Sequence, residues 1–294
     1  MYYTETICGS IPALITPFSQ SGDIDLESFK NLLSWHVDKG SHGLVICGTT
    51  GESPTVTDEE HLTLAKAAVE NTPEGYPIII GCGSNATQKA IKLTRQAQQA
   101  GASAALIVVP YYNKPSQQGL YAHFKAIHDA TTLPIILYNV PSRTITDISD
   151  ETVIALAQLE RIIGIKDATG DLSRLENMKK HISKDFTFLS GDDMSATQYI
   201  QNGGQGCISV SANVVPDKCA AVYNALKNGD TTNAMQMDQK LAPLHNAMFI
   251  EPSPAAAKYA LAQMEKIENI IRLPLLPLSA EGIAKIENTL KQNT

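Results

Sequence analysis

The chain has 294 residues and a formal net charge of −7, which is enough length for one large α/β barrel or for two smaller domains. Its longest basic run is the pair Lys179-Lys180, so we expect neither a nucleic-acid-binding surface nor an anchor for anionic membranes. Its apolar runs are all far shorter than the ~18 residues that a membrane-spanning helix needs.

Eight short apolar runs alternate with longer segments of helical period. Strands of a parallel sheet that is covered on both faces read as continuous apolar runs with little alternation. In chain order the predicted strands are 11–16, 43–47, 77–81, 104–109, 135–139, 162–166, 186–190 and 206–209. Eight strand–helix units predict an α/β fold of the (β/α)8 TIM barrel type. The alternative, an open doubly wound sheet, is disfavoured because no G-x-G-x-x-G follows the first strand.

Helical patterns fill the segments between these runs. After the first run, Leu26, Phe29, Leu32, Leu33 and His36 form one helical stripe. A capping box at 57–60 predicts the start of the next helix. Further helices are predicted at 87–100, 117–131, 149–159, 172–182, 193–202 and 215–228. Glycines 40, 101 and 203 follow predicted helix ends, where a left-handed residue closes the helix.

The pattern changes after residue 229. Helices are predicted at 231–249, 254–266 and 279–291, and no further strand is predicted. We therefore expect two parts: residues 1–229 as a catalytic barrel domain and residues 230–294 as a C-terminal helical domain packed outside it.

Histidine and cysteine usage indicates no metal site. The seven histidines include no HxxxH pair and have no cysteine at ligand spacing. Cys47, Cys82 and Cys207 sit in or just after apolar runs, where we expect small buried hydrophobic residues. The scattered, odd set of five cysteines fits a reducing compartment, and residues 1–5 lack the pattern of a signal peptide. We expect a soluble, cytoplasmic protein.

Lys166 closes the apolar run 162–165, which is an unusual place for a lysine. Burial disfavours the charged form of an amine, and the neutral form is a nucleophile toward carbonyl carbon. Gly164 shares the strand face of Lys166, so its missing side chain is expected to leave room for the lysine. The alternative is a lysine that reaches solvent or pairs with Asp167 or Asp171.

Other polar residues follow the predicted strands, and in such barrels function sits at the carboxyl ends of strands. The turn 48–53, GTTGES, offers hydroxyl and N–H groups that suit an anion such as a carboxylate, or it is an ordinary glycine-rich turn. Tyr138 can pass a proton, or its hydroxyl faces water. Arg143 can clamp a carboxylate, or it is a surface residue. Asp192 and Asp193 are expected to cap the helix predicted at 193–202.

Together these groups form a consistent set. An amine, a phenol, two hydroxyls and a guanidinium at one rim are what a Schiff-base enzyme needs. The lysine attacks a ketone, a relay moves protons, and cations and amides hold carboxylates.

Long motifs carry a resemblance to a known family. They are GSIPALITPF from Gly9, GTTGES from Gly48, PYYNKPSQ from Pro110, LYNVPSRT from Leu137, GIKDATGD from Gly164, LSGDD from Leu189, and Leu244-His245-Asn246. In this order and nearly end to end, the chain resembles the dihydrodipicolinate synthase/N-acetylneuraminate lyase family. The resemblance implies a lyase that condenses pyruvate with L-aspartate 4-semialdehyde in the diaminopimelate route to lysine. It also implies a homotetramer, built as a dimer of dimers, that needs no metal or organic cofactor.

The resemblance also implies residue roles in catalysis. Lys166 forms the imine with pyruvate. Tyr138 and Thr49 form a proton relay with Tyr112, which the neighbouring subunit contributes.

Further roles concern substrate binding. Thr50 holds the pyruvate carboxylate, and Arg143 meets the carboxylate of the semialdehyde. Gly191 and Ile208 line the site.

Two other functions stay open. A pyruvate-dependent lyase acting on a sugar acid such as N-acetylneuraminate would share the lysine and the tyrosine, but not usually the Pro141-Ser142-Arg143 turn. A non-catalytic binding barrel is disfavoured because the lysine, tyrosine and threonine positions are all filled.

The family's regulatory pocket is altered. Asn85, His61 and Tyr111 match the lysine-inhibited members of the family. Lys89 stands where an acidic residue would be, and Asp58 stands where a histidine would be. Since a cation at Lys89 repels the ammonium groups of a bound lysine, we expect weak or absent feedback inhibition.

Overall fold

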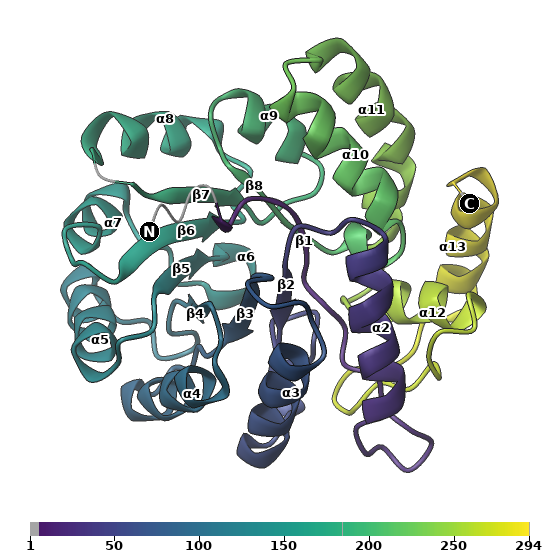
Figure 1. The fold of residues 1–294 in the computed structure, drawn as a ribbon, viewed down its shortest axis with the longest axis horizontal. Coiled ribbons are helices and arrows are strands. Elements are labelled where there is room, and N and C mark those ends of the chain that lie inside the picture. The colour runs from purple at the N-terminus through teal and green to yellow at the C-terminus, as the bar shows by residue number, and fades with distance from the viewer. Residues whose placement is uncertain (1–5, 184, 294) are drawn as a thin grey trace.

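Eight parallel strands form a barrel with helices around it (Figure 1). The computed structural model describes residues 6–183 and 185–293, so the expectation for residues 1–5 lies outside the described part. The strands are β1 (Gly9–Pro12), β2 (Leu44–Ile46), β3 (Ile78–Gly81), β4 (Ala104–Val108), β5 (Ile135–Asn139), β6 (Ile162–Asp167), β7 (Thr187–Ser190) and β8 (Gly206–Ser209). Their order is β1-β8-β7-β6-β5-β4-β3-β2, and a parallel bridge between Ala13 and Val45 brings the two ends together. The predicted barrel is confirmed.

The first strand departs most from its prediction. Residues 11–15 of the predicted strand are apolar, yet β1 ends at Pro12, because the chain then turns from β8 toward β2. The N–H of Ala13 donates to Ser209 O (2.8 Å), and the N–H of Leu14 donates to Val45 O (2.9 Å). Ile15 is buried without belonging to a strand. The apolar run therefore indicates which residues are buried, but it does not indicate where the strand ends.

The predicted helices are present, most of them within a few residues of their expected ends. They are α2 (Leu26–Asp38), α3 (Asp58–Glu70), α4 (Thr87–Ala100), α5 (Gln117–Ala130), α7 (Asp150–Leu156), α8 (Leu172–His181), α9 (Ala196–Gln201) and α10 (Pro216–Lys227). The capping box before α3 is confirmed: Glu60 N donates to Thr57 Oγ1 (3.2 Å), and Thr57 N donates to Glu60 Oε2 (2.8 Å). Glycines 40, 101 and 203 all have the expected left-handed φ.

The predicted start of α9 was wrong. The helix begins at Ala196, and neither acidic residue caps it. Asp192 instead accepts hydrogen bonds from the N–H and the hydroxyl of Ser195. Asp193 is buried and accepts N–H bonds from Val210 (2.9 Å) and Ser211 (3.1 Å), so it holds the chain just after β8.

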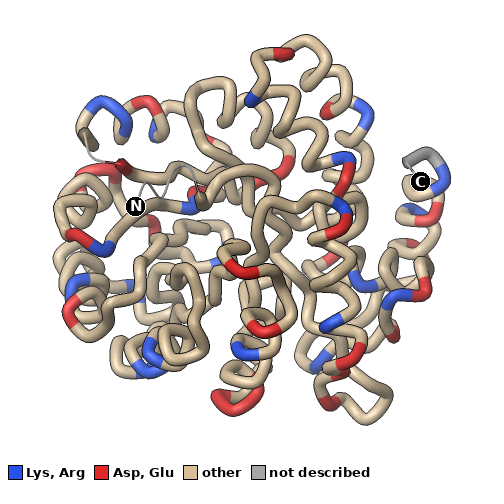
Figure 2. Tube along the Cα trace, viewed as in Figure 1, with Lys and Arg blue, Asp and Glu red and all other residues tan. Residues whose placement is uncertain are grey.

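Two apolar layers hold the barrel together. One fills the barrel interior and includes Ile11, Val45, Ile136 and Ile208. The larger one packs the strands against the surrounding helices. Cys47, Cys82 and Cys207 are buried free thiols, as predicted. Figure 2 shows acidic and basic residues interspersed along the outer helices.

The three predicted C-terminal helices are α11 (Thr231–Ala247), α12 (Ala255–Gln263) and α13 (Ala280–Asn293). Helix α11 packs on α10, and α13 packs on α11 and α12. In Figure 1, α12 and α13 lie on the side of α2 and α10, away from α4 and α5. None of the described helices is long and apolar enough to cross a membrane.

His36 in α2 allows a test of this packing by pH. Its side chain is fully buried against Ser41, and burial, with a smaller contribution from the charge of Lys266, lowers its pKa from 6.5 to about 3. Between these two pH values the unfolded chain binds a proton that the folded chain excludes. The free energy of unfolding therefore falls as the pH falls, by up to about 1.4 kcal/mol per pH unit from this residue.

We expect His36→Leu to reduce the loss of stability between pH 6.5 and 4, measured as the shift of the urea midpoint. The control is His181→Leu, because His181 is exposed on α8. If both variants lose stability as steeply as the wild type, burial of a neutral His36 is not the cause.

Candidate functional site

Strained backbone gathers at the carboxyl rim of the barrel. Six non-glycine residues in the described ranges have left-handed φ, and five of them lie on rim loops: Cys47 (54°), Glu52 (56°), Tyr112 (73°), Lys114 (44°) and Ile145 (61°). Such conformations are costly and cluster at functional sites in proteins. The strained backbone therefore indicates a functional site at the carboxyl rim.

Lys166 lies on β6 with only 6% of its surface exposed. It pairs in register with Tyr138 of β5, and its Nζ lies 4.2 Å from the centroid of the Tyr138 ring. No carboxylate of the described residues lies within 4.0 Å of this nitrogen. Asp171 instead binds Ser173 at the start of α8, and Asp167 binds Arg174. The expected burial is confirmed, and the alternative of pairing with Asp167 or Asp171 is wrong.

The space around Lys166 depends on Gly191, which directly follows the neighbouring strand β7. A Cβ added to Gly191 would lie 2.8 Å from Lys166 Cε, so only glycine leaves the lysine its present path. Gly164 does share the inward face, but a Cβ there would lie 2.5 Å from Thr187 O. The expected role of Gly164 is therefore corrected: it lets β7 approach β6. Ile208 belongs to the same interior apolar cluster as Tyr138.

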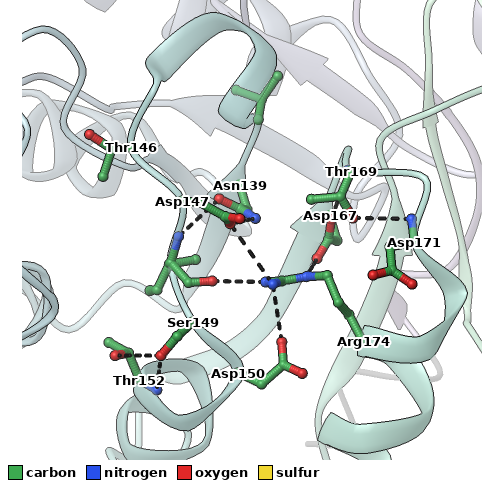
Figure 3. A network of polar contacts seen from close by, with 12 residues as sticks. Asn139, Thr146, Asp147, Ser149, Asp150, Thr152, Asp167, Thr169, Asp171 and Arg174 are labelled. Atoms are coloured by element: carbon green, nitrogen blue, oxygen red, sulfur yellow. Dashed lines mark hydrogen bonds and ion pairs between the residues drawn. The ribbon is translucent and has the colours of Figure 1, made fainter.

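A polar network lies behind this pair, on the outer side of the sheet (Figure 3). Asn139 and Asp167 follow Tyr138 and Lys166 in the chain and pair in register with each other. The Asn139 amide donates to Asp147 Oδ1 (2.8 Å), and Arg174 Nε donates to Asp167 Oδ2 (2.8 Å).

Arg174 of α8 joins the two sides of this network. It donates to Ile148 O (2.8 Å) and contacts Asp150 Oδ1 (3.3 Å) and Asp147 Oδ1 (3.9 Å). Figure 3 shows its guanidinium group pointing among these carboxylates. The ends of β5 and β6 are thus held together at their outer face, which fixes where Tyr138 and Lys166 project on the inner face. Sequence reasoning missed this network. Strand alternation could have placed Asn139 and Asp167 outside, but no sequence signal names Arg174 as their partner.

A cleft of about 320 Å³ opens on the rim. Its lining includes Thr49 and Arg143, and also Asp58, His61, Lys89 and Tyr111. A smaller cavity of about 30 Å³ shares Thr49 with this cleft and reaches Tyr138. The structure thus brings together the threonine and arginine of the predicted site with four of the five regulatory candidates. Asn85 does not line the cleft, and its carbonyl accepts a hydrogen bond from Asn113 (2.8 Å).

The GTTGES turn uses the backbone N–H groups of its second half internally. The N–H groups of Gly51 and Ser53 donate to Gly48 O, and that of Glu52 donates to Thr49 O. The backbone N–H groups of the turn that could face an anion are thereby narrowed to those of Gly48, Thr49 and Thr50. Thr49 is half-buried and Thr50 is buried.

Arg143 and Tyr112 lie on the most exposed parts of the rim. Arg143 is exposed on the short helix α6 (Pro141–Thr144), a segment expected as a loop. Tyr112 is 90% exposed and does not line the cleft of its own chain. Within one chain, the structure does not bring Tyr112 to Lys166.

Two of the regulatory candidates, Asp58 and His61, already have partners in the structure. Asp58 binds Lys92 (2.6 Å) and lies 3.8 Å from Lys89. His61 Nε2 lies 3.0 Å from Gly81 O, and burial lowers the pKa of this imidazole. The altered pocket therefore carries a partly exposed lysine and an acid that two lysines already neutralise.

Comparisons with known proteins agree with this geometry. The sequence model of the dihydrodipicolinate synthetase family matches residues 6–293. A 4-hydroxy-tetrahydrodipicolinate synthase of Roseobacter denitrificans is 48% identical over 96% of this chain and 97% of its own length. The crystal structure of chloride-inhibited dihydrodipicolinate synthase from Acinetobacter baumannii, complexed with pyruvate, is 43% identical, with a TM-score of 0.95 over 98% of this chain and 99% of that one. A structure described as the first monomeric dihydrodipicolinate synthase variant is 38% identical, with a TM-score of 0.95 over 99% and 98%.

The polar network behind Lys166 can be tested by stability. Arg174→Met leaves the buried carboxylate of Asp167 without its cation, so we expect the free energy of unfolding to fall by about 3–5 kcal/mol in urea denaturation. Adding Asp167→Asn should recover part of this loss. The control is Arg161→Met, since Arg161 donates mainly to the carbonyl of His128 and leaves no carboxylate buried. Equal losses in the two arginine variants would contradict a charge-based network.

Proposed function

Since the chain belongs to the dihydrodipicolinate synthetase family, we propose that it condenses pyruvate with L-aspartate 4-semialdehyde to give 4-hydroxy-tetrahydrodipicolinate. The observation that carries this proposal is the buried amine of Lys166 against the ring of Tyr138. It stands at the carboxyl end of a barrel strand, where enzymes of this fold place their chemistry.

The first half of the reaction forms an enamine. Lys166 Nζ attacks C2 of pyruvate, and the carbinolamine loses water to give an iminium ion. A proton then leaves C3, and the electron pair is held by the iminium nitrogen. We assign the proton transfers to Tyr138 and Thr49, and the binding of the pyruvate carboxylate to Thr50. The shared lining of Thr49 and Tyr138 in one small cavity supports the relay.

The second half forms the ring. The enamine C3 attacks the aldehyde carbon of the semialdehyde, which makes the new C–C bond and a hydroxyl. The amino group of the semialdehyde then adds to C2 and displaces Lys166, so that one water is released overall. Arg143 is assigned to the semialdehyde carboxylate, because it is a guanidinium on the wall of the cleft that also holds Thr49. We assign Gly191 and Ile208 to the lining of the site.

A second subunit would complete the site. Tyr112 is held in a left-handed conformation and is 90% exposed, which supports a tyrosine that projects into a neighbouring copy. We therefore propose a homotetramer whose tight dimers exchange Tyr112, even though one structural relative is described as monomeric.

We assign the chemistry to residues 1–229 and a supporting role to the helical part, residues 230–294. The imine itself is the electron sink, so these steps call for no metal or organic cofactor. We place the reaction in the cytoplasm, in the diaminopimelate route to lysine.

Trapping of the imine tests the assignment of Lys166. With pyruvate and borohydride we expect one stable adduct on Lys166, located by peptide mass, and none in Lys166→Ala. Tyr138→Phe should form it about 10²–10⁴-fold more slowly, because it lacks the acid–base group. Lys114→Ala, which removes an exposed rim lysine, is the control.

The second substrate separates the proposed synthase from a sugar-acid lyase. L-aspartate 4-semialdehyde should consume the enamine, whereas N-acetylmannosamine should not. The reverse result, or an adduct on a lysine other than Lys166, would overturn the proposal.

Feedback inhibition by lysine should be weak or absent. Lys89 would repel a ligand ammonium, and Asp58 is already bound to Lys92. We expect nearly unchanged turnover with L-lysine up to about millimolar concentration at neutral pH. Lys89→Glu should introduce inhibition, and Lys66→Glu, on the exposed side of α3, should not. Half-inhibition of the wild type at micromolar lysine would contradict this.

A further inference from the structure

A second buried lysine, Lys258, has no part in the reaction steps above. It lies on α12 in the C-terminal helical part and is fully buried. Its Nζ forms an ion pair with Glu52, donates to Ile270 O (2.8 Å) and lies 4.1 Å from the centroid of the Phe18 ring. Burial lowers its pKa to about 8 although Glu52 opposes the shift. Desolvation of the two charges offsets much of the attraction between them, so a contribution to stability does not by itself explain this pair.

Glu52 is the acid of the GTTGES turn. It is 1% exposed and stands in a left-handed conformation (φ 56°) that disfavours a non-glycine residue. One of its carboxylate oxygens contacts Lys258, and the other accepts the backbone N–H of Arg272 (3.0 Å). Its own N–H donates to Thr49 O (3.1 Å). Glu52 thus connects Thr49 of the proposed site, which its backbone N–H binds, to the C-terminal part, which its carboxylate binds.

Arg272 holds the other end of the same segment. Its guanidinium makes a two-pronged contact with Glu60 (2.5 and 2.8 Å) and also donates to Thr55 O (2.8 Å). Glu60 is the acid of the capping box that begins α3. The guanidinium lies 4.2 Å from the Phe18 ring, next to Lys258 on the same ring. Residues 52–60 are therefore held at both ends by residues 258–272.

We propose that Glu52, Lys258 and Arg272 form a latch, through which the C-terminal helical part positions Thr49 and Thr50 for the reaction. These three are positioning residues, since none of them lines the cleft. The inference rests on the proposed roles of the two threonines. Among the described residues, two other side chains bind the backbone of the turn: Thr16 Oγ1 donates to Gly51 O (2.7 Å), and Thr55 Oγ1 donates to Glu52 O (3.0 Å). Since the carbonyl of Thr55 is itself held by Arg272, the outer half of the turn depends on the latch.

The test uses a pair of variants that separates stability from positioning. Glu52→Gln and Lys258→Met each strand a buried charge, so both should lower the thermal midpoint. Combining them removes both charges and should restore much of that midpoint. We nevertheless expect the double variant to keep a kcat/KM for pyruvate about 100-fold below wild type, because small displacements of catalytic groups cost about that much.

The split between kcat and KM distinguishes positioning from loss of folded enzyme. A smaller folded fraction lowers kcat alone, whereas displaced threonines should also raise KM for pyruvate. Tyr259→Phe is the control: it removes a bond from α12 to Glu287 (2.8 Å), next to Lys258 but away from the turn. It should leave kcat and KM unchanged.

Wild-type kcat and KM in a stable double variant would overturn the latch. Should the double variant fail to fold, kcat and KM of Glu52→Gln test the latch instead. This variant is assayed below its own thermal midpoint, and it keeps the shape of the side chain and an acceptor for the N–H of Arg272. Borohydride trapping of pyruvate on the wild type is run alongside. Absence of that adduct would count against the proposed function, whereas an adduct with unaffected variants would count against the latch alone.

Discussion

The register between β5 and β6 is the constraint on which the site depends. It pairs Tyr138 with Lys166 and Asn139 with Asp167, and strand alternation sends the first pair into the barrel and the second pair outward. A slip of one residue would exchange these faces and place an aspartate where the amine now stands. Arg174 opposes such a slip, because it holds the outward pair through carboxylates on both sides. A buried lysine is therefore kept beside a phenol and apart from carboxylates, which is the environment that an amine nucleophile requires.

The barrel places the proposed reacting groups, and the rest of the chain supports them from outside. On one side the support is Arg174 of α8. On the other side it is the C-terminal helical part, whose Lys258 pairs with Glu52 of the GTTGES turn and whose Arg272 pairs with Glu60. Both supports are ion pairs with little access to water, so losing one partner costs more than the pair contributes. Such pairs therefore favour one arrangement of the loops and strands that they join over slightly displaced arrangements. That property suits a site whose proposed catalytic groups come from two strands and from rim loops.

Much of the fold was readable from short-range patterns. The strands at 135–139 and 206–209 and the helix at 87–100 have the predicted bounds. The errors share a cause. Residues 13–15 are apolar because they are buried, yet they leave β1 to bridge β8 and β2. Asp193 precedes a helix in sequence, but its carboxylate binds the N–H groups of Val210 and Ser211. Gly164 faces inward as expected, but the atom that needs its space belongs to Thr187. In each case a partner distant in sequence outweighed the local preference.

The sequence by itself determined the class of fold, the strand that carries Lys166 and the rim on which Tyr138, Thr49 and Arg143 would meet. These follow from alternation and helical period, which depend on residues only a few positions apart. The tertiary structure alone decided which groups share a cleft, that Tyr112 stands exposed, and that Glu52 meets Arg272 at a separation of 220 residues. Contacts of that kind cannot be predicted from local sequence, because the residues around each partner are compatible with many other contacts. Only the closed barrel, with the C-terminal helices packed on one side of it, selects the one that forms.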